Sequence, residues 1–122
     1  MLLNDFYRIG EMTGAEGILS AEIRLNRHHS IFDGHFPGLP VVPGVCMMQM
    51  IREILETHFG KKYILRSAVQ VKFLSVINPD EHPDILSDIR FQSPAENELD
   101  VVAKLYSGDI TFFKLKARLS VV

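Results

Sequence analysis

A histidine in a loop rich in glycine and proline is the first feature of this sequence that could do chemistry. His35 lies between residues 27 and 44, where the glycines and prolines allow neither a long helix nor a long strand. An imidazole can take up and return protons near neutral pH, and packing against apolar neighbours such as Phe36 and Val41 would keep it neutral. His35 is therefore a candidate general base. The alternative is a structural histidine whose ring satisfies a loop carbonyl.

A glycine at the start of the predicted helix is the second candidate. Gly44 follows Pro43, and the first N–H groups of a helix have no partner within the helix, while the helix dipole favours negative charge there. The amide of Gly44 could therefore donate to an oxyanion. A glycine after a proline is also ordinary at the beginning of a helix, so this second interpretation stays open.

The elements that must position these residues follow from hydrophobic periodicity. Apolar and polar residues alternate from Gly17 to Asn26, which predicts a strand with one buried face, and an earlier strand is expected near residues 6–12. A helix is predicted from Val45 to Phe59, with Gly60 just past its end. Four more strands are expected near residues 69–73, 85–91, 99–105 and 113–121, with a hairpin turn at 107–109.

This order of elements predicts an α+β fold in which one helix packs against a mainly antiparallel sheet. The length of 122 residues indicates one domain, residues 1–122. A sheet with a single covering helix leaves an edge strand to protect, and pairing with a second copy would do so. A homodimer or higher oligomer is therefore expected.

The composition and net charge limit the classes of molecule that the protein is expected to bind. Apolar residues make up 47% of the chain and charged residues 23%, with a net charge of −2, so we expect a soluble protein that binds neither nucleic acid nor membrane. The single cysteine, Cys46, and the lack of a signal peptide favour the cytoplasm. The five histidines and Cys46 show no metal-ligand spacing, so no metal site is expected. Two groups of basic residues are either solvated or able to dock an acidic partner. The first, after the helix, is Lys61, Lys62 and Arg66, and the second, on the last strands, is Lys104, Lys114, Lys116 and Arg118.

The segment from Gly34 to Val45 reads GHFPGLPVVPGV and resembles the signature of the 3-hydroxyacyl-[acyl-carrier-protein] dehydratases of fatty-acid synthesis. The preceding Phe32 fits the same motif, and the segment from Phe73 to Pro79 resembles a later motif of that family, with Val76 in place of a proline. The resemblance implies the hotdog fold, in which a long central helix is wrapped by a curved antiparallel sheet of about six strands. It also implies a dimer with two substrate tunnels at the subunit interface.

The resemblance further implies a lyase that needs no metal or redox cofactor and acts on acyl thioesters carried by acyl carrier protein. His35 would take the C2 proton of a 3-hydroxyacyl thioester, and the Gly44 N–H would bind the thioester carbonyl. An acid from the helix of the other subunit would help hydroxide leave, so that water is eliminated and the trans-2-enoyl thioester is formed. We expect four residues to contact the substrate, namely Phe36, Pro43, Val45 and Phe73.

The sequence departs from its family at the position of the catalytic acid. Fourteen residues after the motif histidine the family has Glu or Asp, whereas this chain has Gln49, which can hydrogen-bond but cannot give a proton as an acid does. In one interpretation His35 both takes the C2 proton and returns it to the leaving oxygen, which Gln49 holds. In the other, Glu53 supplies the acid from the next helical turn, although it is more simply expected to be an exposed carboxylate.

Gln49 also keeps other functions open. The chain could be a non-catalytic hotdog subunit that binds acyl thioesters, or one that completes a heterodimer in which a relative supplies the missing carboxylate. Thioester hydrolysis on the same scaffold would need a carboxylate or a positioned water, and the His-Phe-Pro motif favours the dehydratase instead.

Overall fold

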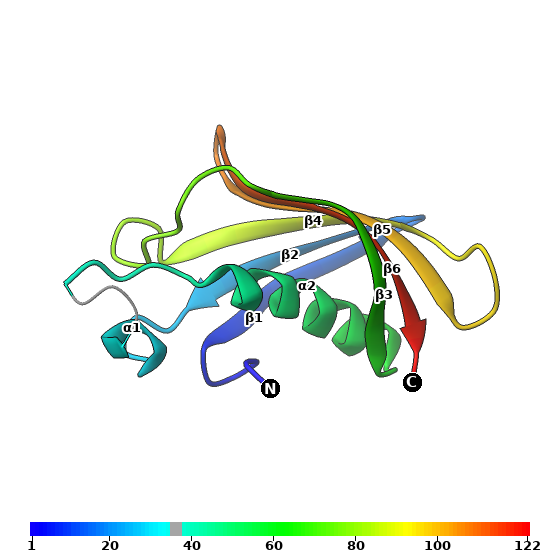
Figure 1. Ribbon diagram of the computed structural model, residues 1–122, viewed down its shortest axis with the longest axis horizontal. Helices are drawn as coiled ribbons and strands as arrows, with labels where there is room; N and C mark the ends of the chain where they lie inside the picture. The colour runs from blue at the N-terminus through cyan, green and yellow to red at the C-terminus, as the bar shows by residue number, and fades with distance from the viewer. Residues whose placement is uncertain (35–37) are drawn as a thin grey trace.

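The computed structural model describes residues 1–34 and 38–122 and has six strands and two helices. A long helix lies along one face of a curved sheet (Figure 1). The strands are β1 (Tyr7–Ala15), β2 (Ile18–Leu25), β3 (Tyr63–Phe73), β4 (Asp84–Gln92), β5 (Glu98–Ser107) and β6 (Ile110–Val121). The helices are α1 (Ile31–Gly34), a single turn that was not predicted, and α2 (Gly44–Phe59). The predicted α+β architecture is confirmed.

The strands form one antiparallel sheet in the order β1-β2-β4-β5-β6-β3. Neighbours in sequence pair directly except around β3, which follows α2 and joins the far side of the sheet beside β6. Strands β1 and β3 are therefore the two edges. A sequence pattern marks a strand but not its neighbour, so the edge position of β3 was not predicted.

Helix α2 packs in the core of the protein because most of its circumference is apolar. Met50, Ile54 and Leu55 are fully buried against the sheet, as the dense apolar pattern of the sequence predicts. The helix ends at Gly60, which has a left-handed backbone (φ 66°) and donates its N–H to the Glu56 carbonyl, 2.9 Å away. The predicted bounds of 45–59 are thus correct to within one residue. No helix in the described part of the chain is long and apolar enough to cross a membrane.

Strand β3 differs from the alternating pattern that its sequence suggests. It is longer than expected, and from Leu65 onwards every residue of the strand is exposed in the single chain. Val69 is 73% exposed and Phe73 57%. Strand β3 is at the edge of the sheet, where β6 pairs with one side of it and no strand of residues 1–34 and 38–122 pairs with the other.

The segment before β1 closes over α2. Phe6 and Tyr7 are completely buried, and the Phe6 ring packs on Phe32 and against His29. His29 also contacts Asp5, with 3.0 Å between Nε2 and Oδ2. Only 12% of the His29 side chain is exposed because this segment covers it.

Candidate active site

The loop that carries the motif ends at the first turn of α2. Pro43 is extended (φ −61°, ψ 145°) and its carbonyl accepts hydrogen bonds from the N–H groups of Cys46 and Met47 at 3.0 and 3.3 Å. The loop is also held by Val42, which donates its N–H to the carbonyl of Ile77 at 2.9 Å. Earlier amides of the turn have no acceptor within the helix. The N–H of Gly44 is therefore placed as an anion or oxyanion donor requires.

The aromatic ring of Phe73 lies directly against Gly44. A Cβ atom at position 44 would lie 2.7 Å from Cε1 and 2.8 Å from Cζ of Phe73, which is closer than non-bonded carbons approach. The ring also packs on Phe113, with 5.2 Å between ring centroids. The structure thus brings together two predicted site residues that are far apart in the sequence, and a Cβ atom at position 44 would fit only if the Phe73 ring moved.

An apolar groove of about 280 Å³ begins one residue further along α2. It runs between the exposed side of the helix and strands β3 and β6, and Arg52 and Gln49 are its polar residues. Val45 and Gln49, both predicted site residues, line it together. The remaining lining residues are Met48, Ile51, Ile64, Leu65, Leu115 and Leu119.

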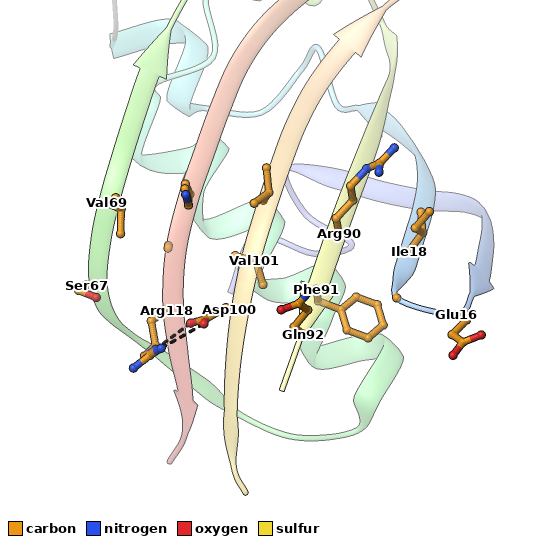
Figure 2. Close-up of a pocket in the computed structure, with 14 residues that line it drawn as sticks. Glu16, Ile18, Ser67, Val69, Arg90, Phe91, Gln92, Asp100, Val101 and Arg118 are labelled. Carbon is orange, nitrogen blue, oxygen red and sulfur yellow. Dashed lines mark hydrogen bonds and ion pairs between the residues drawn. The ribbon is translucent and has the colours of Figure 1, made fainter. Parts of the chain in front are cut away.

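A larger hollow of about 880 Å³ lies on the opposite face of the sheet (Figure 2). It contains the hydrogen-bonded pair of Arg118 and Asp100, whose Nε and Oδ1 atoms are 2.7 Å apart. None of its lining residues is a histidine or cysteine, and α2 lies behind the sheet. The groove beside Gly44 is therefore the better candidate for thioester chemistry.

Glu53 is the unexpected feature of α2. The sequence suggested an exposed carboxylate, but Glu53 is only 1% exposed because the segment before β1 covers it. Oε1 accepts hydrogen bonds from the Leu3 N–H (2.9 Å) and the Tyr7 hydroxyl (3.0 Å). Oε2 accepts from the Leu2 N–H (3.0 Å) and from Nε2 of Gln49 (2.8 Å). The expectation of an exposed Glu53 is therefore wrong.

The hydrogen bonds decide the charge of this carboxyl group. Burial raises the pKa of Glu53, but the bonds from Gln49, Leu2, Tyr7 and Leu3 lower it by more, so the pKa lies below its ordinary value. Burial, followed by the negative charge of Glu53, raises the pKa of Tyr7. The pair is thus an ionised carboxylate and a neutral phenol at neutral pH.

Comparison with known proteins identifies the family to which the chain belongs. A family model described as ApeI-like, ApeI dehydratase, matches residues 11–104. The chain belongs to the ApeI-like family. This ApeI-like chain is 24% identical over 107 residues to the 3-hydroxyacyl-[acyl-carrier-protein] dehydratase FabZ of Fusobacterium nucleatum, covering 84% of this chain and 74% of that protein. The FabZ of Oenococcus oeni is 30% identical over 88 residues, covering 66% of this chain and 61% of that protein.

Solved structures place the ApeI-like chain among hotdog folds. The dehydratase heterocomplex ApeI:P from Xenorhabdus doucetiae has a TM-score of 0.72 at 21% identity, covering 93% of this chain and 97% of that chain. A mutant of thioesterase PA1618 from Pseudomonas aeruginosa has a TM-score of 0.62 at 10% identity, covering 95% and 81%. At these identities the structures show the fold alone. The family match and the FabZ relatives support a dehydratase-family enzyme.

Two predicted site residues of the ApeI-like chain, His35 and Phe36, lie outside the described residues. Their roles remain predictions. Among the other predicted residues, Gly44 and Phe73 touch, Val45 and Gln49 share the groove, and Pro43 precedes the first turn of α2. Contact of these residues with substrate also stays a prediction.

Sequence reasoning missed the role of Glu53 in this ApeI-like protein. One signal was present, because Cys46, Met50 and Glu53 are spaced i, i+4 and i+7 and so lie along the buried side of the helix. Consistent with this, burial and then the charge of Glu53 raise the pKa of the Cys46 thiol. The backbone donors that stabilise the carboxylate could not be predicted, because Leu2 and Leu3 are 51 and 50 residues away in the chain.

Proposed function

We propose that this ApeI-like protein removes water from a 3-hydroxyacyl thioester carried on acyl carrier protein and forms the trans-2-enoyl thioester. The observation that carries the proposal is the amide of Gly44 at the start of α2, beneath the Phe73 ring and next to an apolar groove. An acyl chain fits such a groove, and the amide offers a donor to the thioester oxygen. The residues that precede this amide form the motif that contains His35.

The proposed reaction uses one imidazole twice. Neutral His35 removes the C2 proton while the thioester oxygen, which gains negative charge, accepts a hydrogen bond from the Gly44 N–H. The imidazolium then gives that proton to the oxygen on C3. The C3–O bond breaks with its electron pair on oxygen, the C2–C3 double bond forms, and water leaves with His35 restored to its neutral form.

Gln49 has a supporting part in this scheme. Its Nε2 is hydrogen-bonded to Glu53, so the amide oxygen remains available to accept a hydrogen bond from the substrate hydroxyl. That bond leaves the lone pairs of the hydroxyl oxygen open to the imidazolium. Glu53 is not suited to act as the acid, because its lowered pKa keeps it ionised and its oxygens already accept four hydrogen bonds.

A second copy of the chain would complete the site. Strand β3 is an edge strand whose apolar residues are exposed, and the groove lies between this strand and α2. Pairing of β3 with a second β3 would satisfy its free backbone groups and cover its apolar residues, which include Leu65, Val69 and Phe73. The homodimer is thus part of the proposal.

A row of lysines supports a carrier protein as the form in which substrate arrives. On the face of the sheet away from α2, Lys104 on β5 is opposite Lys114 on β6, which in turn is opposite Lys72 on β3. None of the ion pairs among residues 1–34 and 38–122 includes these lysines. Like charges directly opposite one another destabilise a sheet, so an acidic partner that neutralises them would bind favourably.

Turnover by the purified protein tests the proposal. The substrates are one 3-hydroxyacyl group attached either to acyl carrier protein or to a small pantetheine-like thiol, and the absorbance of the enoyl thioester is followed. We expect His35→Ala to abolish turnover and His28→Ala, a change at an exposed histidine of the same loop, to leave it unchanged. Equal activity of both variants would refute the role of His35.

The same assay tests the carrier protein. Lys114→Glu should raise KM for the carrier-borne substrate while leaving KM for the small thioester unchanged. Arg8→Glu, at an exposed arginine of β1 that belongs to neither basic group, is the control. Equal effects of the two charge reversals, or equal effects on both substrates, would exclude docking at the lysine row.

A heterodimeric subunit is the second candidate function, and the bonding of Gln49 favours it. With Nε2 bound to Glu53, position 49 offers no acidic proton. The similar fold of the dehydratase heterocomplex ApeI:P gives a precedent for assembly with a different chain. If the homodimer is inactive but becomes active when mixed with a hotdog relative that has Glu or Asp at the corresponding position, this second function is correct.

A further inference from the structure

A buried carboxylate on α2 forms no ion pair with any of the described residues. Within the described part of the chain, the ion pairs involve other residues, and Glu53 is 1% exposed. An isolated buried charge costs free energy unless hydrogen bonds compensate for it. Here four donors compensate, two on each oxygen, so the carboxylate is saturated.

The donors come from two parts of the protein. Leu2 and Leu3 precede β1 and Tyr7 is its first residue, whereas Gln49 lies one turn before Glu53 on α2. An ionised carboxylate only accepts hydrogen bonds, so the amide of Gln49 can meet it only through its NH₂ group. The amide oxygen of Gln49 must then point away from Glu53, and Gln49 lines the groove.

We infer that Glu53 is a positioning residue that fixes the amide of Gln49, so that its oxygen is presented to the substrate hydroxyl in the groove. The inference rests on the proposed function for the identity of that hydroxyl. Without the carboxylate the amide of Gln49 could turn over and present its NH₂ group instead. Residues 2–7 are part of the same hydrogen-bond network, because they supply three of the four hydrogen bonds that hold Glu53.

The chain offers a matched control. Glu56 is also a buried glutamate on α2, 8% exposed, and its Oε2 accepts a hydrogen bond from the backbone N–H of Tyr63 at 2.9 Å. It does not line the groove, and no hydrogen bond joins it to Gln49 in the described part of the chain. Glu56→Gln therefore removes a buried carboxylate from the same helix without releasing the amide of residue 49.

Nuclear magnetic resonance tests the positioning without any need for turnover. The two side-chain amide protons of Gln49 should have widely separated shifts in the wild type, because one of them is bonded to a carboxylate. In Glu53→Gln this separation should shrink, and in Glu56→Gln it should persist. Unchanged Gln49 signals in folded Glu53→Gln protein would overturn the inference, whether or not the protein is a dehydratase.

Kinetics then test the consequence for catalysis. We expect Glu53→Gln to lower kcat by roughly tenfold to a hundredfold with little change in KM, because the acyl groove and the Gly44 amide stay in place. Glu56→Gln should leave kcat unchanged even where it lowers stability. Equal losses of kcat in the two variants would show a merely structural role for Glu53.

The exchanged pair Gln49→Glu/Glu53→Gln keeps the inference falsifiable if Glu53→Gln alone folds poorly. In this double variant the side-chain amide at position 53 can donate a hydrogen bond to the carboxylate at position 49, so the bond between the two positions is restored. We expect unfolding to show favourable coupling between the two sites, and kcat to recover above that of Glu53→Gln. Additive effects of the two changes would overturn the inference, whereas an inactive wild type would contradict only the proposed function.

Discussion

Replacing Gln49 with glutamate tests the electrostatics of the site independently of its activity. Nε2 of Gln49 lies 2.8 Å from Oε2 of Glu53, so a second carboxylate would stand beside one that is buried and ionised. Two unit charges about 4 Å apart repel by about 4 kcal/mol at an effective dielectric constant of about 20. Residue 49 is only half-buried, and solvent screening reduces this repulsion to about 2 kcal/mol.

The two carboxyl groups would avoid the repulsion by keeping one proton between them, so one pKa of the pair is raised. A pKa raised by folding contributes stability at low pH that is lost as the pH rises. We therefore expect Gln49→Glu to be within about 0.5 kcal/mol of the wild type at about pH 4, and about 2 kcal/mol less stable at about pH 8. Urea unfolding at both pH values measures the difference.

The background variant Glu53→Gln provides the control. Without a carboxylate at position 53 there is no repulsion, so Gln49→Glu should lose no stability between about pH 4 and about pH 8. A pH-independent effect in the wild-type background, or the same pH dependence in both backgrounds, would refute the reasoning. In the proposed elimination the raised pKa also lets the carboxyl group at position 49 act as a proton donor, so turnover of Gln49→Glu should rise, by up to about a hundredfold.

Three further outcomes follow from the structure. The pKa of Glu53 is lowered by folding, so its contribution to stability is present at neutral pH and lost as the pH falls, and acid unfolding of Glu53→Gln should depend less steeply on pH than that of the wild type. Gly44→Ala pushes the exposed Phe73 ring aside. The better helix propensity of alanine offsets this strain, so stability should change by no more than about 1 kcal/mol, while kcat/KM for the thioester should fall. Val69→Lys on the edge strand should give a monomer in light scattering, whereas Val102→Lys, also at an exposed valine, should not.

Local patterns predicted α2 well because everything that defines the helix is near in sequence. The dense apolar residues bury it, and Gly60 ends it in a left-handed conformation that glycine adopts without strain. The contact between Phe73 and Gly44 was different, since it depends on β3 crossing to the far side of the sheet. Both residues were named from the resemblance, but their contact is a property of the topology.

The burial of Glu53 shows the limit of helical periodicity. Its i+7 spacing from Cys46 places it on the apolar side of α2, yet a carboxylate is ordinarily exposed unless it is paired. The deciding groups are two backbone amides and a tyrosine hydroxyl before and at the start of β1. Backbone amides are present in every sequence, so no pattern of residue types could reveal that these two would stabilise a charge on a distant helix.

The position of the charge on α2 determines which proton route the proposed elimination can use. A carboxyl group in the groove could give a proton to the leaving oxygen. Glu53 does not line the groove but is hydrogen-bonded to Gln49, which does. Four hydrogen-bond donors keep Glu53 ionised. Moving a proton onto Glu53 would weaken those bonds and leave buried donors without a good acceptor. In the proposed reaction the proton therefore stays with His35, and Gln49 contributes orientation through an oxygen whose direction Glu53 sets.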